Sequence, residues 1–350
     1  MGLVQHYPAL KRPANPICSV CIANYNGTSL LADCLDSVLA QHCEASTEII
    51  VHDDASTDDS VAFLREKYPQ VEVLASTENV GFCVSNNRMV AHARGEYILL
   101  LNNDAALYPN ALSTLLKAAR QQTPAGILTL PQYDWTTGVL VDRGCLLDPF
   151  YNPVPNLDPK RTDVAMVIGA CLFLPHTLWI ELQGFPEWFE SIGEDLYLCC
   201  LARLRGAPVQ VTSDCGYRHR QGVSFGGNRI TSGQLQTTFR RRRLSERNKT
   251  FALAIFTPTR AMWSLLAVHL SVLLFEGLVV SVLRMNYRIF HDIYANVPIS
   301  LLRDQKALRK LRLEVQSTRN APTKIFFQTF SLLPRKITML LRFGIPRITK

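Results

Sequence analysis

The chain has 350 residues and a formal net charge of +8 at pH 7. Its basicity belongs to the C-terminal part alone, since residues 240–350 contain 21 Lys and Arg against 5 Asp and Glu, whereas residues 1–239 contain 16 against 24. The length allows two domains, and the charge asymmetry indicates an acidic globular part that carries a basic, surface-seeking extension. An acidic body repels phosphate, which argues against nucleic acid as a partner.

The 10 cysteines do not indicate a disulfide framework. The N-terminal residues lack the apolar core of a secretory signal, so we expect reduced thiols in a cytosolic compartment. Cys18 and Cys21 form a CxxC within an apolar run. No second CxxC or Cys/His pair at zinc spacing accompanies it, which disfavours zinc or redox chemistry there.

The first 121 residues alternate between apolar runs and helical patterns. Strands are expected at 17–22, 48–52, 71–74 and 97–101, and helices at 29–41, up to 67, up to 93 and from Pro109 to 121. This repetition predicts right-handed βαβ units in an α/β fold, with a mostly parallel sheet covered by helices on both faces.

Polar side chains follow two of these strands. Asp53 and Asp54 end the second, and Asn102, Asn103 and Asp104 end the fourth. Ligands of open α/β sheets bind at the carboxyl ends of the strands, and these oxygens suit a divalent cation that also holds phosphates. Neither GxGxxG nor the P-loop motif is present. The alternative is a pair of ordinary capped turns.

The pattern loosens between residues 126 and 162, which predicts either a lid or recognition surface or an irregular connection. Residues 164–174 then read as a buried strand, and a helix at 176–182 and an aromatic loop at 185–193 lead to Asp195. Asp195 is expected at the start of the helix 196–204, either as its N-cap or as a general base. His219 follows a last strand at 209–212 and is flanked by two arginines.

Taken in this order, the motifs resemble the inverting nucleotide-sugar glycosyltransferases of family 2, which have the GT-A fold, and especially bacterial rhamnosyltransferase-like members that build surface polysaccharides. The resemblance covers residues 17–227. The matching segments are SVCIANYNGTSLLADCLDSVLAQ, IIVHDDASTDDS, ENVGF with SNN, LLLNNDA, GACLFLPHTLWIELQGF and GEDLYLCCLARLRG.

The resemblance implies a role for each matching residue. Asp53 would bond the nucleobase, with Asp54 beside it and Ala23 and Tyr25 lining the same pocket. The remaining donor-binding residues would be Gly81, Asn87, Asn102 and Asn103. Asp104 would ligate a divalent cation, Mg²⁺ or Mn²⁺, and His219 would contact that metal or the diphosphate. Asp195 would be the base that deprotonates the acceptor hydroxyl.

The expected organisation is an N-terminal extension (1–16), a GT-A domain (17–235) and a basic, helical, membrane-associating region (236–350). Within that last region, residues 263–283 are long and apolar enough to span a membrane. His269 and Glu276 interrupt this stretch, which favours a helix lying in the interface, with basic segments attracted to anionic lipid. The alternative is a buried helix hairpin that packs on the domain or in a dimer.

The sequence and the resemblance together predict a glycosyltransferase on the cytoplasmic side of the inner (plasma) membrane, peripheral or partly embedded. Its substrates would be a nucleoside-diphosphate sugar, with dTDP-rhamnose favoured, and a lipid-linked or growing surface glycan. Its other partners would be the membrane surface and, if it forms a homo-oligomer, a second copy of the chain. The competing hypothesis is a catalytically inactive scaffold of the same fold.

Overall fold

The computed structural model describes residues 3–222, 227–231 and 234–349. The chain forms two compact units. The sheet unit comprises Met1–Cys145, Pro155–Ala202 and Ala207–Ser224, and the helical unit comprises Leu146–Val154, Arg203–Gly206 and Phe225–Lys350. Residues 223–226, near the end of the stretch that resembles glycosyltransferases, lie outside the described residues.

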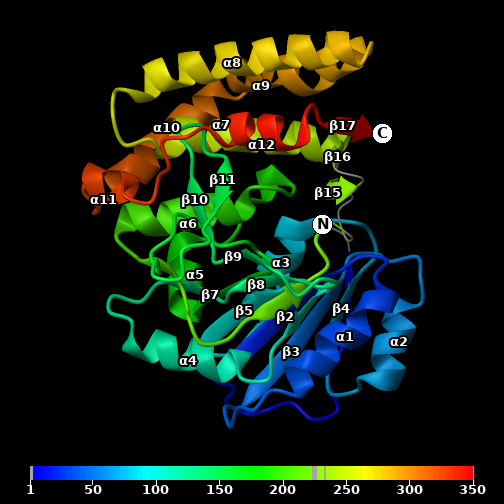
Figure 1. Cartoon of the computed structure of the whole chain (residues 1–350). Helices are drawn as coiled ribbons and strands as arrows, with labels where there is room; N and C mark the ends of the chain where they lie inside the picture. The colour runs from blue at the N-terminus through cyan, green and yellow to red at the C-terminus, as the bar shows by residue number, and fades with distance from the viewer. Residues whose placement is uncertain (1–2, 223–226, 232–233, 350) are drawn as a thin grey trace. The chain divides into compact units, whose positions relative to one another are not determined.

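An eight-stranded sheet forms the centre of the sheet unit (Figure 1). Its order is β1 (Val4–Tyr7), β4 (Glu72–Ser76), β3 (Thr47–Asp53), β2 (Cys18–Asn24), β5 (Tyr97–Leu101), β12 (Cys171–Pro175), β7 (Ile127–Thr129) and β13 (Val209–Val211). Strands β2 to β5 are mutually parallel, while β1 and β12 are antiparallel to their neighbours. The predicted mostly parallel sheet is confirmed.

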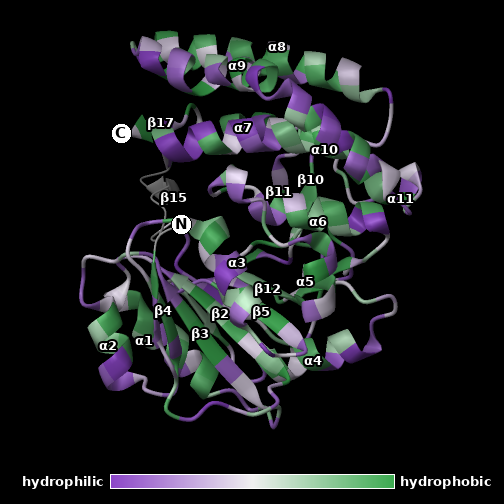
Figure 2. Cartoon of the chain, turned by 180° about the vertical axis from the view of Figure 1, so that it is seen from behind, coloured by the Kyte–Doolittle hydropathy of each residue, from purple (hydrophilic) through white to green (hydrophobic). Residues whose placement is uncertain are grey.

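Helices cover both faces of this sheet. The apolar sides of α1 (Thr28–Leu39), α2 (Ser60–Lys67) and α4 (Ala111–Gln121) share one core cluster with alternate residues of the strands. Helix α3 (Phe82–His92) packs on β2 and β3 with residues outside that cluster, and therefore on the opposite face. The strands contribute mostly apolar residues, as expected for strands buried on both faces (Figure 2).

Two expectations about the second half differ in detail from the structure. Residues 164–170 are not a strand, because Gly169 and Ala170 form a turn and β12 begins only at Cys171. The stretch 126–162 contains short strands, namely β7, β8 (Gln132–Asp134), β9 (Leu140–Asp142), β10 (Cys145–Leu147) and β11 (Pro153–Pro155). Three-residue strands are too short to show a period of two in the sequence.

A second, four-stranded sheet has the order β6 (Ala105–Leu107), β14 (Tyr217–His219), β8 and β9. The strand at 209–211 is therefore not the last of the unit, because His219 itself lies in a strand. Helices α5 (His176–Leu182) and α6 (Glu194–Arg205) and the short turn η1 (Glu187–Phe189) complete the elements around it. Asp195 is the second residue of α6.

The helical unit contains the predicted C-terminal helices. They are α7 (Phe239–Phe256), α8 (Met262–Leu283), η2 (Ile289–Ala295), α9 (Asn296–Arg303), α10 (Gln305–Ser317), α11 (Thr323–Phe327) and α12 (Arg335–Phe343). A small sheet of β15 (Gly227–Thr231), β16 (Gln234–Thr238) and β17 (Arg347–Thr349) joins them.

Helix α8 is the one helix in the described residues that is long and apolar enough to cross a membrane, judged by length and composition. One of its faces packs on α7 and η2. His269 lies on this face and is 3% exposed, with Nε2 2.8 Å from Thr250 Oγ1. Glu276 forms ion pairs with Arg242 and Lys336. Both polar residues that interrupt the apolar stretch are therefore satisfied inside the unit.

The other face of α8 carries exposed apolar side chains. Figure 2 shows that the helix is mostly hydrophobic along its length. Its exposed large side chains are Trp263, Val268, Val272, Phe275, Leu278 and Val282. Phe275 is 69% exposed. The helix is therefore only partly covered within the unit, and its outward face is a largely apolar strip that also exposes Ser264 and Ser271.

Candidate active site

A chain of amides and carboxylates crosses the ends of three neighbouring strands. Asn103, after β5, donates from Nδ2 to Asn24 Oδ1 at 2.8 Å, and Asn24, at the end of β2, donates from Nδ2 to Asp53 Oδ2 at 2.9 Å. All three side chains are buried. Asp53 also accepts from the backbone N and the Oγ of Ser56. These bonds fix the strand ends relative to one another.

Asp54 holds the loop that follows β4. Its Oδ1 accepts from Val80 N at 2.7 Å and its Oδ2 from Gly81 N at 2.9 Å. Burial raises the pKa of Asp54, and these two N–H groups partly oppose that effect. Gly81 has φ +88, which disfavours any residue with a Cβ. The structure thus brings Asp53, Asp54, Gly81 and Asn103 to the same edge of the sheet.

Asp104 and His219 meet through strand pairing. Ala105 in β6 lies opposite His219 in β14, so the residue before Ala105 is placed beside the imidazole. Asp104 Oδ1 lies 3.0 Å from His219 Nε2, and the residues are 2% and 7% exposed. The backbone N–H of Arg220 donates to Asp104 O at 3.0 Å. The predicted pair of metal ligands is therefore in contact.

The surroundings of His219 suit a cation. Its Nδ1 lies 3.2 Å from Gln132 Oε1, which also accepts from Tyr217 OH at 2.7 Å. A proton on Nδ1 satisfies that contact and leaves the Nε2 lone pair facing a carboxylate oxygen. Two acceptors in that position need a shared proton or a metal ion between them. A carboxylate oxygen beside an imidazole nitrogen fits Mn²⁺, whereas Mg²⁺ would be held mainly through the carboxylate.

Asp142 adds a further buried carboxyl to this sheet. It pairs in register with Gln132, is 4% exposed and accepts from Gly144 N at 3.0 Å. Burial raises the pKa of Asp142 to about 7, although the Gly144 bond and the charge of His219 act in the opposite direction. The carboxyl therefore titrates near neutral pH in the folded protein.

Asp195 is joined to the end of β5 by a turn. Gly169 N donates to Asp195 Oδ2 at 3.1 Å, and Asn102 N donates to the carbonyl of the next turn residue, Ala170, at 3.1 Å. A Cβ at Gly169 would touch Phe82 and Asp195, both at 3.9 Å. The turn thus places the predicted base close to the strand end that bears Asp104.

Aromatic side chains border Asp195 along the chain. Trp188 contacts Phe189 and Tyr197 edge to face, and it is 43% exposed. Phe82 stacks on Phe185 from the other side of the same loop. Apolar surroundings of this kind suit a carboxylate that takes a proton from a hydroxyl.

The remaining predicted donor residues differ in their surroundings. Ala23 is partly exposed at the end of β2, and Tyr25 is 52% exposed in the loop after it. Asn87 is bonded to the aromatic loop, donating to Phe185 O and accepting from Phe185 N, both at 2.9 Å. Its amide therefore connects α3 to that loop, a position that the motif did not reveal.

Sequence reasoning missed Asn24, Gln132 and Asp142. Asn24 adjoins the predicted Ala23, and its place at a strand end was a signal that could have been used. Gln132 and Asp142 lie in the stretch where no regular pattern is visible, and Gln132 meets His219 from 87 residues away. No local signal could have identified these two.

Comparisons with known proteins indicate a family for part of the chain. Residues 19–169 match the model of the family described as glycosyl transferase family 2. The chondroitin synthase of Escherichia coli is 29% identical over 188 residues, which are 52% of this chain and 26% of that protein. The poly(ribitol-phosphate) beta-glucosyltransferase of Bacillus spizizenii is 28% identical over 208 residues, 57% of this chain and 31% of that protein.

Among solved structures, the mannosyltransferase PcManGT from Pyrobaculum calidifontis in complex with GDP-Man and Mn²⁺ matches with a TM-score of 0.50 at 16% identity. The match covers 89% of this chain and 88% of that one, and at this identity it shows the fold alone. The chain spans less than a third of the length of the two curated relatives. Residues 19–169 therefore match a glycosyl transferase family 2 domain, and the chain has a GT-A-like fold, as its motifs predicted.

Proposed function

We propose that this chain is a metal-dependent inverting glycosyltransferase that moves a sugar from a nucleoside diphosphate to a hydroxyl of a lipid-linked or growing surface glycan. The observation that carries the proposal is the buried Asp104–His219 pair at the edge where Asp53 and Asp54 end a neighbouring strand. The family 2 domain around this edge supports the same class of reaction.

The donor would lie across the strand ends. Asp53, Asp54, Ala23 and Tyr25 would bind the nucleoside, and the loop at Gly81 with Asn87, Asn102 and Asn103 would position the ribose and diphosphate. A divalent cation held by Asp104 and His219 would offset the charge that develops on the departing diphosphate.

Asp195 would act as the general base. Inversion at the anomeric carbon needs one in-line displacement, in which the acceptor oxygen forms a bond to that carbon as the bond to the diphosphate breaks. The carboxylate of Asp195 takes the proton of the acceptor hydroxyl, so no covalent nucleophile is required. The Gly169 N–H would orient that carboxylate.

The substrates follow by analogy with relatives. The two curated relatives are named as a chondroitin synthase and a poly(ribitol-phosphate) beta-glucosyltransferase, and the solved neighbour holds GDP-Man and Mn²⁺. We favour a dTDP-sugar such as dTDP-rhamnose from the motif resemblance. The chain would act on the cytoplasmic side of the plasma membrane.

The outward face of α8 would provide attachment to that membrane. Its apolar strip is followed by Arg284 and Arg288 and preceded by Arg260, all exposed. Apolar burial in the interface combined with attraction of arginine to anionic lipid is the usual basis of peripheral attachment. Lipid-linked acceptors would then be within reach.

A thermal-shift screen of UDP-, GDP- and dTDP-sugars, each with and without Mn²⁺ or Mg²⁺, tests the donor site. The proposal predicts a rise in Tm with at least one sugar nucleotide that requires the metal. Absence of metal-dependent binding across the whole panel would contradict it and favour a scaffold of the same fold.

A further inference from the structure

A second cluster of metal-ligating side chains lies at the β1 edge of the sheet, away from the central strand β5. His6 comes from the edge strand β1, Glu72 from β4 and His92 from the last turn of α3. The ligand atoms of the three residues all lie within 4.8 Å of one another. His6 Nε2 is 2.7 Å from Glu72 Oε1, and His92 Nε2 contacts the same oxygen.

We propose that His6, Glu72 and His92 form a binding site for a divalent transition metal of the Zn²⁺ type. Two imidazole nitrogens and one carboxylate oxygen are a common ligand set for Zn²⁺, with a fourth position open to water. Mg²⁺ and Ca²⁺ prefer oxygen ligands, so they fit this set poorly. The site is separate from the Asp104–His219 pair and does not depend on the proposed transferase activity.

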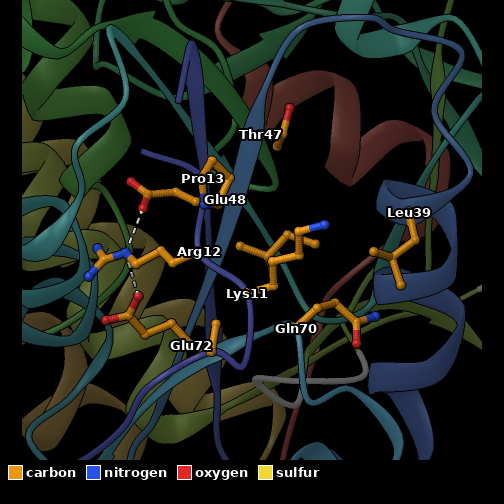
Figure 3. Close-up of a pocket in the computed structure, with 10 residues that line it drawn as sticks. Lys11, Arg12, Pro13, Leu39, Thr47, Glu48, Gln70 and Glu72 are labelled. Atoms are coloured by element: carbon orange, nitrogen blue, oxygen red, sulfur yellow. Dashed lines mark hydrogen bonds and ion pairs between the residues drawn. The ribbon is translucent and has the colours of Figure 1, made fainter. Parts of the chain in front are cut away.

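The second oxygen of Glu72 is held by an arginine. Arg12 Nε lies 2.8 Å from Glu72 Oε2 and 3.0 Å from Glu48 Oε2, so the guanidinium lies between the two carboxylates (Figure 3). This leaves Glu72 Oε1 directed at the histidines. Partners that orient a ligating carboxylate in this way are typical of metal sites, and Glu48 offsets the charge of Arg12.

The hydrogen-bond pattern around His92 also indicates a cation. Arg12 Nη1 lies 3.4 Å from His92 Nε2. If Nε2 carried a proton for Glu72, this N–H would face the N–H groups of arginine, two donors in opposition. A lone pair on Nε2 removes that conflict, because it can accept from Arg12 Nη1. The same lone pair lies beside the carboxylate oxygen Glu72 Oε1, an arrangement that a metal ion also satisfies.

The site has a solvent path and connects distant parts of the chain. His6 is exposed and His92 is half-buried, so solvent reaches both imidazoles. A pocket of about 100 Å³ next to the site is lined by Arg12, Glu48 and Glu72 among others, but not by the histidines (Figure 3). Glu72 itself is 1% exposed, so the site combines a buried anchor with an open rim. A bound ion would tie β1 to β4 and α3 and stabilise that edge of the sheet.

The test uses the full chain, freed of metal by chelator dialysis and titrated with Co²⁺ in excess Mg²⁺, which occupies oxygen-rich sites. Wild type should show a visible Co²⁺ d–d band that saturates at one equivalent, disappears on addition of Zn²⁺ and accompanies a rise in Tm. H6A changes an exposed residue on an edge strand and should lose at least about tenfold in Co²⁺ affinity. R12M should lose about 10-fold to 100-fold, the usual cost of removing an orienting partner.

Two matched variants make the result specific. H219A removes the imidazole of the proposed donor site, and H291A removes an exposed histidine of the helical unit; both should keep the band. The proposal is overturned if wild type shows no Co²⁺ band, or if the band survives in H6A and H92A. A band that disappears only in H219A would place the metal at the strand ends and equally overturn it.

Discussion

Asp104 and His219 are 115 residues apart and meet because β6 and β14 pair in a register that puts Ala105 opposite His219. Spacing in the sequence could not show this contact. It was predicted from the resemblance to glycosyltransferases, which supplied the two residues in the right order. The residues that orient His219, by contrast, were not foreseen, because they come from strands of only three residues.

Asp104→Asn should weaken metal-dependent donor binding by at least about tenfold, since it removes the only charged ligand of the pair while keeping the shape of the side chain. Isothermal titration of the donor in the presence of Mn²⁺ measures the effect. Asp134→Asn in the neighbouring strand β8 is the control, because that carboxylate bonds Thr136 and Thr137. Equal binding by wild type and D104N would exclude Asp104 as a ligand.

Asp142 should make the protein less stable as pH rises. Its folded pKa of about 7 lies above the ordinary aspartate value of 3.8, so the folded state holds a proton that the unfolded chain releases. The free energy of unfolding should therefore fall between about pH 4 and pH 7. In Asp142→Asn, urea unfolding at pH 5 and pH 8 should show a smaller difference than in wild type. An unchanged pH dependence would show that Asp142 is ionised throughout.

Hydrogen bonds from Asn103 through Asn24 to Asp53 connect the ends of three strands. Helix α1 begins directly beside these three side chains. Gly27, the N-cap of α1, is buried against them. A Cβ there would overlap the side chains of both Asn24 and Asn103. The absence of a side chain is thus what lets the helix start so close to the strand ends.

Gly27→Ala should destabilise the sheet unit by about 1–3 kcal/mol, the usual cost of overpacking, and should weaken donor binding because Asn103 and Asn24 must move. Urea unfolding and donor titration measure the two effects. Ser29→Ala, an exposed change in the first turn of the same helix, is the control and should alter neither. A G27A variant as stable as wild type would show that the neighbouring amides relax without cost.

The sequence predicted most of the parallel strands and their helices because each is long enough to show its period. Cys18–Asn24 and Tyr97–Leu101 are continuous apolar runs, and α1 has a clear apolar stripe. The antiparallel direction of β12 and the small β6–β14–β8–β9 sheet could not be predicted. Their pairing is decided by contacts between distant residues and leaves little trace in local sequence.

The sequence of helix α8 likewise does not reveal how the helix packs. Its sequence is apolar on nearly all sides, so periodicity does not reveal which face is packed. The structure shows that the side with His269 and Glu276 faces the unit, where burial favours a raised pKa for Glu276 but Lys336 and Arg242 hold it below its ordinary value. The polar residues that argued against a simple membrane span are the ones that fix the inward face.

The basic C-terminal part of the chain and the apolar strip of α8 form the proposed membrane-attachment surface. Phe275→Glu places a charge in the middle of that strip and should reduce sedimentation with anionic phosphatidylglycerol vesicles at least about tenfold. Ile180→Glu is the matched control, since Ile180 is a similarly exposed apolar residue on α5. Equal loss in both variants, or in neither, would contradict docking through α8.

The proposed transferase holds its donor at the strand ends and deprotonates its acceptor with Asp195. The most direct test is the release of nucleoside diphosphate by wild type and Asp195→Asn, with the donor and metal that the thermal-shift screen selects and with membrane lipid extract as the acceptor. We predict donor binding within about twofold of wild type and turnover reduced by about 100-fold or more, the usual contribution of a general base. Unimpaired turnover in D195N would contradict the assignment of the base.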